Sequence, residues 1–310
     1  MVNENINLNE NVSFGNLELL AKQVVEGFVT GLHKSPFHGF SVEFAEHRLY
    51  NKGNSVKNID WKLFARTDKL FVKRYEEETN LRCHLLIDQS SSMYYPEIGI
   101  SKLAFSCLAS AAIINLLKKQ RDAFGLTLFD EDIQFNAAAK STTSHQQFLL
   151  NQMAKSLSQK PHHAKTNLVA NLHAVADKIP KRSFVVLFTD MFSVDADETY
   201  LDDVFIALQH LKYQKNEIII FNVNEQKHEL DFAFENRPYH FIDVESGDEV
   251  KLNPTQFKDV YRQKISLLKH KLIAKCGQFG INLIEAPIES GVYPILNAWL
   301  LARTKSGSHR

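Results

Sequence analysis

Five oxygen-bearing side chains stand next to regular elements that the sequence predicts, and together they could bind a metal ion. They are Asp88, Ser90, Ser92, Thr166 and Asp190. Alternate side chains of an extended segment face the same way, so the first three can converge. Carboxylate and hydroxyl oxygens are hard ligands that suit Mg²⁺ or Mn²⁺ better than softer metals. Because hydroxyls bring no charge, we expect one position on the ion to stay open for an acidic ligand from outside.

The elements that must position these side chains alternate along the chain. Apolar runs typical of buried strands cover residues 83–87, 125–129, 184–188, 218–223 and 281–285. Helical periodicity covers residues 100–119, 145–157, 168–179, 200–211 and 292–303, with a further long helix after Pro254. This alternation predicts an α/β fold, a mostly parallel sheet with helices on both faces. Ligands bind such sheets beyond the carboxyl ends of the strands, where the five side chains are expected.

The first 80 residues follow a different pattern. Apolar residues at three- and four-residue steps predict an amphipathic helix from residue 17 to 32, and residues 70–75 resemble a strand. Between residues 35 and 61 the periodicity is weak. We therefore expect a smaller N-terminal α+β segment over residues 1–80 and an α/β domain over residues 81–310.

Composition argues against several classes of protein. Thirty-six Lys and Arg balance 36 Asp and Glu, so no bulk field would attract nucleic acid. The three cysteines, Cys83, Cys107 and Cys276, are widely spaced, which is typical of a reducing compartment. The N-terminus lacks the pattern of a secretory leader, and no apolar stretch reaches the ~20 residues that a membrane helix needs. We expect a cytoplasmic protein with no transmembrane segment.

The five side chains, in this chain order, resemble the metal-ion-dependent adhesion site of the von Willebrand factor type A domain. That site reads Asp-x-Ser-x-Ser, then Thr, then Asp, and the resemblance covers roughly residues 83–223. It implies that Ser90, Ser92 and Thr166 contact the ion through their hydroxyls. It also implies that Asp88 and Asp190 act directly or through water, and that a partner's carboxylate completes the shell.

The segment upstream of residue 80 resembles a second family. The stretches 48–54, 58–62, 65–67 and 70–73 look like the hallmark of the bacterial domain-of-unknown-function family 58. Members are commonly associated with MoxR-type AAA+ ATPases, which implies an adaptor or chaperone-like role. Lys165 stands where the adhesion site often has Gly, so it would place a cation near the ion, and we take it as a candidate partner-binding residue.

Other readings of the same residues stay open. Asp88, Ser90 and Ser92 alone could cap a helix. A Mg²⁺-dependent phosphohydrolase is the main alternative function, with Asp88 as nucleophile, but Ser90 stands where such enzymes usually carry a second acid. A nucleic-acid-binding N-terminal segment is the third hypothesis. We favour a metal-dependent protein-binding module that is not an enzyme.

Overall fold

The computed structural model describes residues 14–33, 47–49, 61–73, 81–159, 166–191, 198–243 and 247–307. The chain forms two compact units, unit 1 with residues 1–29 and 81–310, and unit 2 with residues 30–80. The helix that we expected in the N-terminal segment thus groups with unit 1, while the boundary at residue 80 coincides with the end of unit 2. The division into domains 1–80 and 81–310 stays a prediction.

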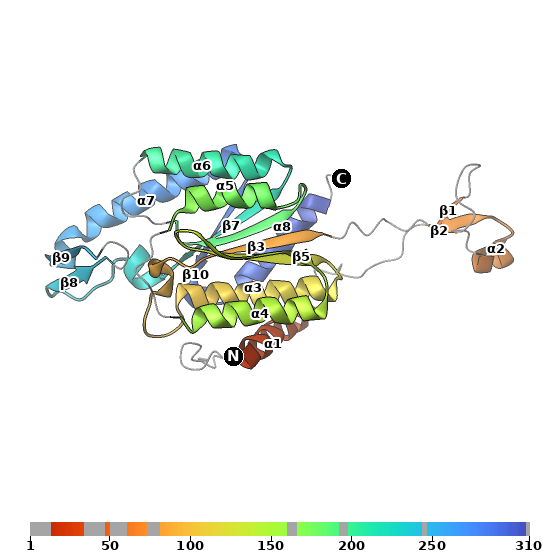
Figure 1. Ribbon diagram of the computed structural model, residues 1–310, viewed down its shortest axis with the longest axis horizontal. Coiled ribbons are helices and arrows are strands. Elements are labelled where there is room, and N and C mark those ends of the chain that lie inside the picture. The colour runs from red at the N-terminus through yellow and green to blue at the C-terminus, as the bar shows by residue number, and fades with distance from the viewer. Residues whose placement is uncertain are drawn as a thin grey trace. The chain divides into compact units, whose positions relative to one another are not determined.

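Unit 1 is built on a six-stranded sheet with the order β10-β7-β6-β3-β4-β5 (Figure 1). The strands are β3 (Arg82–Asp88), β4 (Ala123–Phe129), β5 (Ile133–Lys140), β6 (Phe184–Thr189), β7 (Glu217–Asn224) and β10 (Asn282–Pro287). Every neighbouring pair is parallel except β4 and β5, which are antiparallel. The predicted α/β class is confirmed, with β5 as an antiparallel edge strand that the sequence reading missed.

Helices cover both faces of this sheet (Figure 1). On one face lie α5 (Leu168–Lys178), α6 (Glu198–Tyr213) and α7 (Pro254–Gln278). On the other lie α1 (Phe14–His33), α3 (Lys102–Lys119), α4 (Thr143–Leu157) and α8 (Tyr293–Gly307). Polar side chains fix where the helices start. Ser101 accepts a hydrogen bond from the backbone of Ala104, and Asn167 accepts one from Ala170, which satisfies amides that the first helical turn leaves free.

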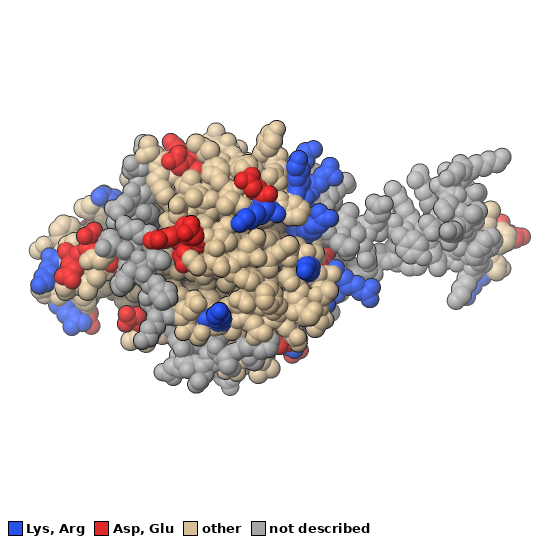
Figure 2. Space-filling view, viewed as in Figure 1, with Lys and Arg blue, Asp and Glu red and all other residues tan. Residues whose placement is uncertain are grey.

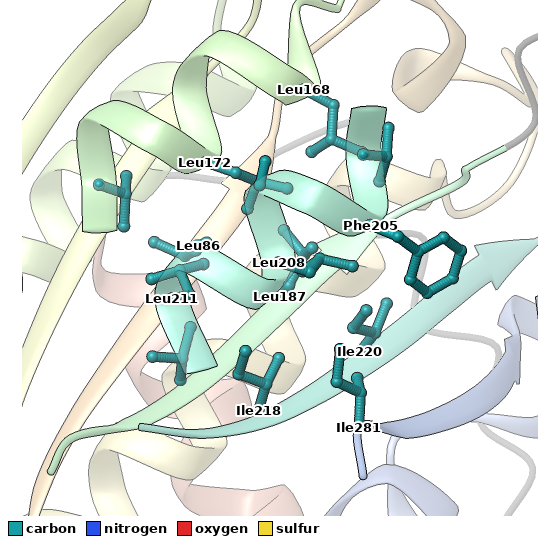
Figure 3. Packing of buried hydrophobic residues seen from close by; sticks show 14 of the residues in the cluster. Leu86, Leu168, Leu172, Leu187, Phe205, Leu208, Leu211, Ile218, Ile220 and Ile281 are labelled. Atoms are coloured by element: carbon teal, nitrogen blue, oxygen red, sulfur yellow. The ribbon is translucent and has the colours of Figure 1, made fainter. Parts of the chain in front are cut away.

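Apolar packing between the sheet and its helices holds the central strands in place. Leu86, Leu187 and Ile220 come from three adjacent strands and pack with Leu172 and Leu208 of α5 and α6 (Figure 3). All residues of β3 after the first are buried, as expected for a parallel strand covered on both faces. The carboxyl ends of β3, β6 and β7 are therefore held in place by a well-packed core.

The region after β7 departs from a simple hairpin. A π-helical turn, η3 (Gln226–Leu230), comes first, and the antiparallel pair β8 (Tyr239–Ile242) and β9 (Glu249–Leu252) follows. A hairpin is thus present in this region, but it starts only after the π-helical turn.

Unit 2 contains the antiparallel pair β1 (His47–Leu49) and β2 (Phe71–Lys73), with α2 (Trp61–Thr67) between them in sequence. Among the residues with a described placement, no helix is both long and apolar enough to cross a bilayer. On the face shown in Figure 2, charged side chains of either sign form small separate groups on a mostly uncharged surface.

Candidate metal centre

The predicted site residues come from loops at one edge of the sheet. Strands β3 and β6 are parallel neighbours, with Ile87 opposite Phe188. Asp88 is the last residue of β3, and Asp190 directly follows β6. A short 3₁₀ helix, η2 (Ser91–Tyr94), continues from the Asp88 loop. The two carboxylates thus leave neighbouring strands at the same edge, where an α/β sheet usually binds its ligand.

Four of the five predicted side chains form one hydrogen-bonded group. The backbone amide of Ser90 donates to Asp88 Oδ1 at 2.9 Å, and the Ser90 and Ser92 hydroxyl oxygens share a hydrogen bond at 3.1 Å. The Thr166 hydroxyl donates to Asp88 Oδ2 at 3.2 Å. Thr166 therefore contacts Asp88 although the two residues are 78 positions apart in the chain. Their binding of a metal ion stays a prediction.

Asp190, the fifth predicted ligand, is held by a cation. Its Oδ2 accepts a hydrogen bond at 2.9 Å from the ammonium of Lys102, the first residue of α3. The same ammonium lies 2.5 Å from Glu229 Oε1 in η3. Lys102 is only 1% exposed, and Asp190 is 5% exposed. A buried ion pair of this kind is stable only when its partners are close and well oriented.

The electrostatics of the group favour an additional cation. Burial, and then the nearby carboxylate of Asp190, raise the pKa of Asp88 to about 7, while hydrogen bonds from Ser90 and Thr189 lower it. Burial alone would lower the pKa of Lys102, but Asp190 and Glu229 raise it above its ordinary value. With all four groups ionised, three carboxylates and one ammonium leave two negative charges, which a divalent ion would neutralise.

The donor set fits a hard ion. Within the described ranges, no three His, Cys, Asp or Glu side chains cluster so that they could hold a metal, so hydroxyl oxygens must complete any site here. The hydroxyls of Ser90, Ser92 and Thr166 lie within the group around Asp88 and supply such oxygens. Mg²⁺ prefers oxygen donors and usually keeps some of its water ligands. Metals that prefer sulfur or imidazole would bind poorly to such a set of donors.

Sequence reasoning missed three residues of this centre. The Thr189 hydroxyl donates to Asp88 Oδ2 at 2.8 Å, but Thr189 lies just after the predicted strand 184–188 and was not proposed for the site. Lys102 lies inside the predicted helix 100–119 and was not proposed for the site, although a cation at a helix N-terminus opposes the helix dipole and so hints at nearby anions. No sequence pattern around Glu229 indicated that it would take part in this centre. Lys165, the candidate partner-binding residue, lies outside the described residues.

A polar cavity of about 550 Å³ adjoins the Asp88 loop. Gln89 and Tyr94 from that loop line one part of it, and Asp130, Asp132 and Lys155 contribute charge elsewhere. The Asn167 amide donates to the Asp130 carbonyl at 3.0 Å, which ties the Thr166 loop to this cavity. A peptide segment of a partner protein that bound in this cavity would therefore lie close to the candidate metal centre.

The sheet and the oxygen-bearing side chains at its carboxyl edge define an α/β protein with a candidate ligand site at its strand ends. The family model described as "Protein of unknown function DUF58" matches residues 46–267, so the chain belongs to that family.

Two curated relatives share part of this chain. Uncharacterized proteins of Mycobacterium tuberculosis (strain H37Rv) and Mycobacterium bovis are each 26% identical over 174 residues, 56% of this chain and 55% of theirs. The chain thus spans about half the length of the curated relatives it matches.

Two solved structures show a distant similarity. The conserved hypothetical protein BatB of Bacteroides thetaiotaomicron is 12% identical, with a TM-score of 0.45, and the match covers 72% of this chain and 99% of that one. An aerotolerance-related membrane protein of Bacteroides fragilis is also 12% identical, with a TM-score of 0.41, and the match covers 67% of this chain and 91% of that one. Neither similarity bears on function.

Proposed function

We propose that this protein is a metal-dependent protein-binding module. Mg²⁺ or Mn²⁺ would be bound by Asp88, Ser90, Ser92, Thr166 and Asp190, and a carboxylate of the partner protein would complete the shell. The observation that carries the proposal is the hydrogen-bonded group that Asp88 forms with Ser90, Ser92 and Thr166, beside the Asp190 carboxylate on the neighbouring strand. No bond needs to be made or broken for this function.

The expected affinity for a partner carboxylate follows from the charges of the proposed ligands, which do not saturate the divalent ion. Hydroxyl oxygens contribute no charge, so an ion held by two aspartates keeps affinity for a further anion. A carboxylate is the only anionic group among protein side chains at neutral pH, apart from perturbed thiols and phenols. The ion would therefore select an exposed Asp or Glu on the partner, and the cavity beside Gln89 and Tyr94 offers room for the flanking residues.

The resemblance to the von Willebrand factor type A adhesion site supports the same role for these residues. The resemblance to family 58 extends the proposal to an adaptor or chaperone-like partner of a MoxR-type AAA+ ATPase in the cytoplasm. Cys83, Cys107 and Cys276 are all free and buried, which fits a reducing compartment.

The alternative, a Mg²⁺-dependent phosphohydrolase, gains no support from the described residues. Such an enzyme would use Asp88 as nucleophile and a second acid nearby to protonate the leaving group. Ser90 occupies the position two residues later, and its hydroxyl is bonded to Ser92. Hydrolysis of a generic phosphate ester that is lost in Asp88→Ala would favour the enzyme over the binding module.

Metal binding and partner capture can be tested together. Titration calorimetry should detect binding of Mn²⁺ to the wild-type chain and none to Asp88→Asn, while Asp259→Asn on the exposed surface of α7 should bind like the wild type. Affinity purification in Mg²⁺ should recover an AAA+ ATPase that is absent in EDTA and with Asp88→Asn. Equal Mn²⁺ binding by the wild type and Asp88→Asn would refute the proposed site.

A further inference from the structure

We propose that the Lys102 ammonium is a built-in competitor for the divalent ion. The ammonium pairs with both Asp190 and Glu229, and it would be retained by Glu229 alone when the ion takes Asp190. This inference rests on the proposed metal site and adds a residue that sets its affinity.

Lys102 has two anchors of different kinds. Asp190 belongs to the predicted ligand set, whereas Glu229 belongs to the π-helical turn after β7. The carboxylate of Glu229 is fixed on its other side, because Oε2 accepts the backbone amide of Glu225 at 2.7 Å. The backbone carbonyl of Glu229 accepts a hydrogen bond from the Tyr261 hydroxyl at 2.8 Å. Glu229 can therefore keep the ammonium in place after Asp190 turns to another cation.

The position of Lys102 is the physical reason to expect this competition. It is the first residue of α3, where the helix dipole disfavours a cation, and its side chain is buried. The ammonium therefore depends on Asp190 and Glu229 for its stabilisation. A divalent ion bound to Asp190 would meet this ammonium at short range in a poorly screened interior, where like charges repel strongly. Displacing Lys102 from Asp190 therefore lowers the net affinity of the site for the ion.

Two substitutions with opposite expected signs test this mechanism. Lys102→Met keeps the unbranched side chain as far as Cε and removes the ammonium, so it should raise Mn²⁺ affinity by about tenfold or more. Glu229→Gln removes the charge of the second anchor, so the ammonium should hold Asp190 more tightly and Mn²⁺ affinity should fall by about threefold to tenfold. Glu235→Gln, whose carboxylate is exposed and pairs with Arg237, is the matched control and should leave affinity unchanged.

The double variant Lys102→Met/Glu229→Gln separates competition from simple charge effects. If Glu229 acts through Lys102, the double variant should bind Mn²⁺ as tightly as Lys102→Met alone. Titration calorimetry with Mn²⁺ measures all four variants, and circular dichroism checks that each is folded. If Lys102→Met does not fold, Lys102→Gln and the double variant Lys102→Gln/Glu229→Gln take their places, because the glutamine amide is uncharged and can still donate a hydrogen bond.

The outcomes distinguish this inference from the proposed site. Loss of affinity in Lys102→Met would show that Lys102 positions Asp190 for the ion and would overturn the competition. Unchanged affinity in Lys102→Met, or wild-type affinity in Glu229→Gln, would overturn it as well. Equal binding by the wild type and Asp88→Asn would instead remove the metal site on which the inference rests.

Discussion

His84 on β3 should make the stability of the fold depend on pH. Its side chain is 4% exposed, and Nε2 lies 2.9 Å from the Thr127 hydroxyl oxygen. That hydroxyl gives its only hydrogen to Asn136 Oδ1 at 2.9 Å, so it accepts a hydrogen bond from His84 Nε2–H. The opposite nitrogen, Nδ1, lies against Gly125 on the neighbouring strand. The structure therefore holds His84 as the neutral Nε2-protonated tautomer.

The magnitude follows from the pKa of His84. Burial lowers this pKa from its ordinary value of 6.5 to about 4, so the unfolded chain takes up a proton more readily than the folded chain. The contribution of His84 to stability is complete above pH 6.5 and is lost as the pH falls from about 6.5 towards 4. At pH 5 the imidazole is mostly charged in the unfolded chain and mostly neutral in the folded chain. This difference lowers the free energy of unfolding by about 2 kcal/mol.

Urea unfolding at pH 7.5 and pH 5.0 measures this cost. In EDTA, the free energy of unfolding of the wild type should fall by about 2 kcal/mol more between the two pH values than that of His84→Gln. Glutamine can donate to the Thr127 hydroxyl but does not titrate, and the other histidines contribute equally to both proteins. An equal loss in the two proteins would refute the assignment of a neutral, buried His84.

Three further substitutions test the packing around the sheet and the candidate metal centre. Gly125→Ala would place its Cβ 2.6 Å from His84 Nδ1 and 2.7 Å from the Ala137 carbonyl oxygen. It should cost about 1–3 kcal/mol in urea unfolding, whereas Gly277→Ala on α7, with nothing within 4 Å, should cost nothing. Leu208→Ala should cost about 2–5 kcal/mol by leaving a cavity in the core, and Ile206→Ala on the exposed face of α6 much less; similar costs would contradict the packing. Thr189→Val removes the hydrogen bond to Asp88 Oδ2 and should destabilise the metal-free protein by about 1–3 kcal/mol, and unchanged stability would contradict that bond.

The sequence was most informative where burial is continuous. Strands such as β6 and β7 are buried along almost their whole length, so their apolar runs were recognised with their neighbouring helices. Strand β5 was missed, although its residues alternate between half-buried and exposed, as expected at a sheet edge. Its inward positions include Ala137 and Ala139, which carry too little apolar surface to form a clear period-2 pattern.

The candidate site was partly predictable for a related reason. Asp88, Ser90 and Ser92 are close in sequence and follow a strand, so their convergence depends only on local geometry. The contacts of Lys102 with Asp190 and Glu229 span 88 and 127 positions, and they depend on how η3 and α3 pack. No local pattern encodes such contacts, and only the unfavourable place of a lysine at a helix start hinted at them.

The most direct measurement is a crystal structure of the chain grown with Mn²⁺, with anomalous diffraction used to locate the ion. We predict one strong anomalous peak within coordination distance of the Ser90 and Ser92 hydroxyl oxygens and of at least one carboxylate, Asp88 or Asp190. In that structure the Lys102 ammonium should pair with Glu229 alone. A peak bound elsewhere, or none at the carboxyl ends of β3 and β6 at saturating Mn²⁺, would contradict the metal-dependent binding module.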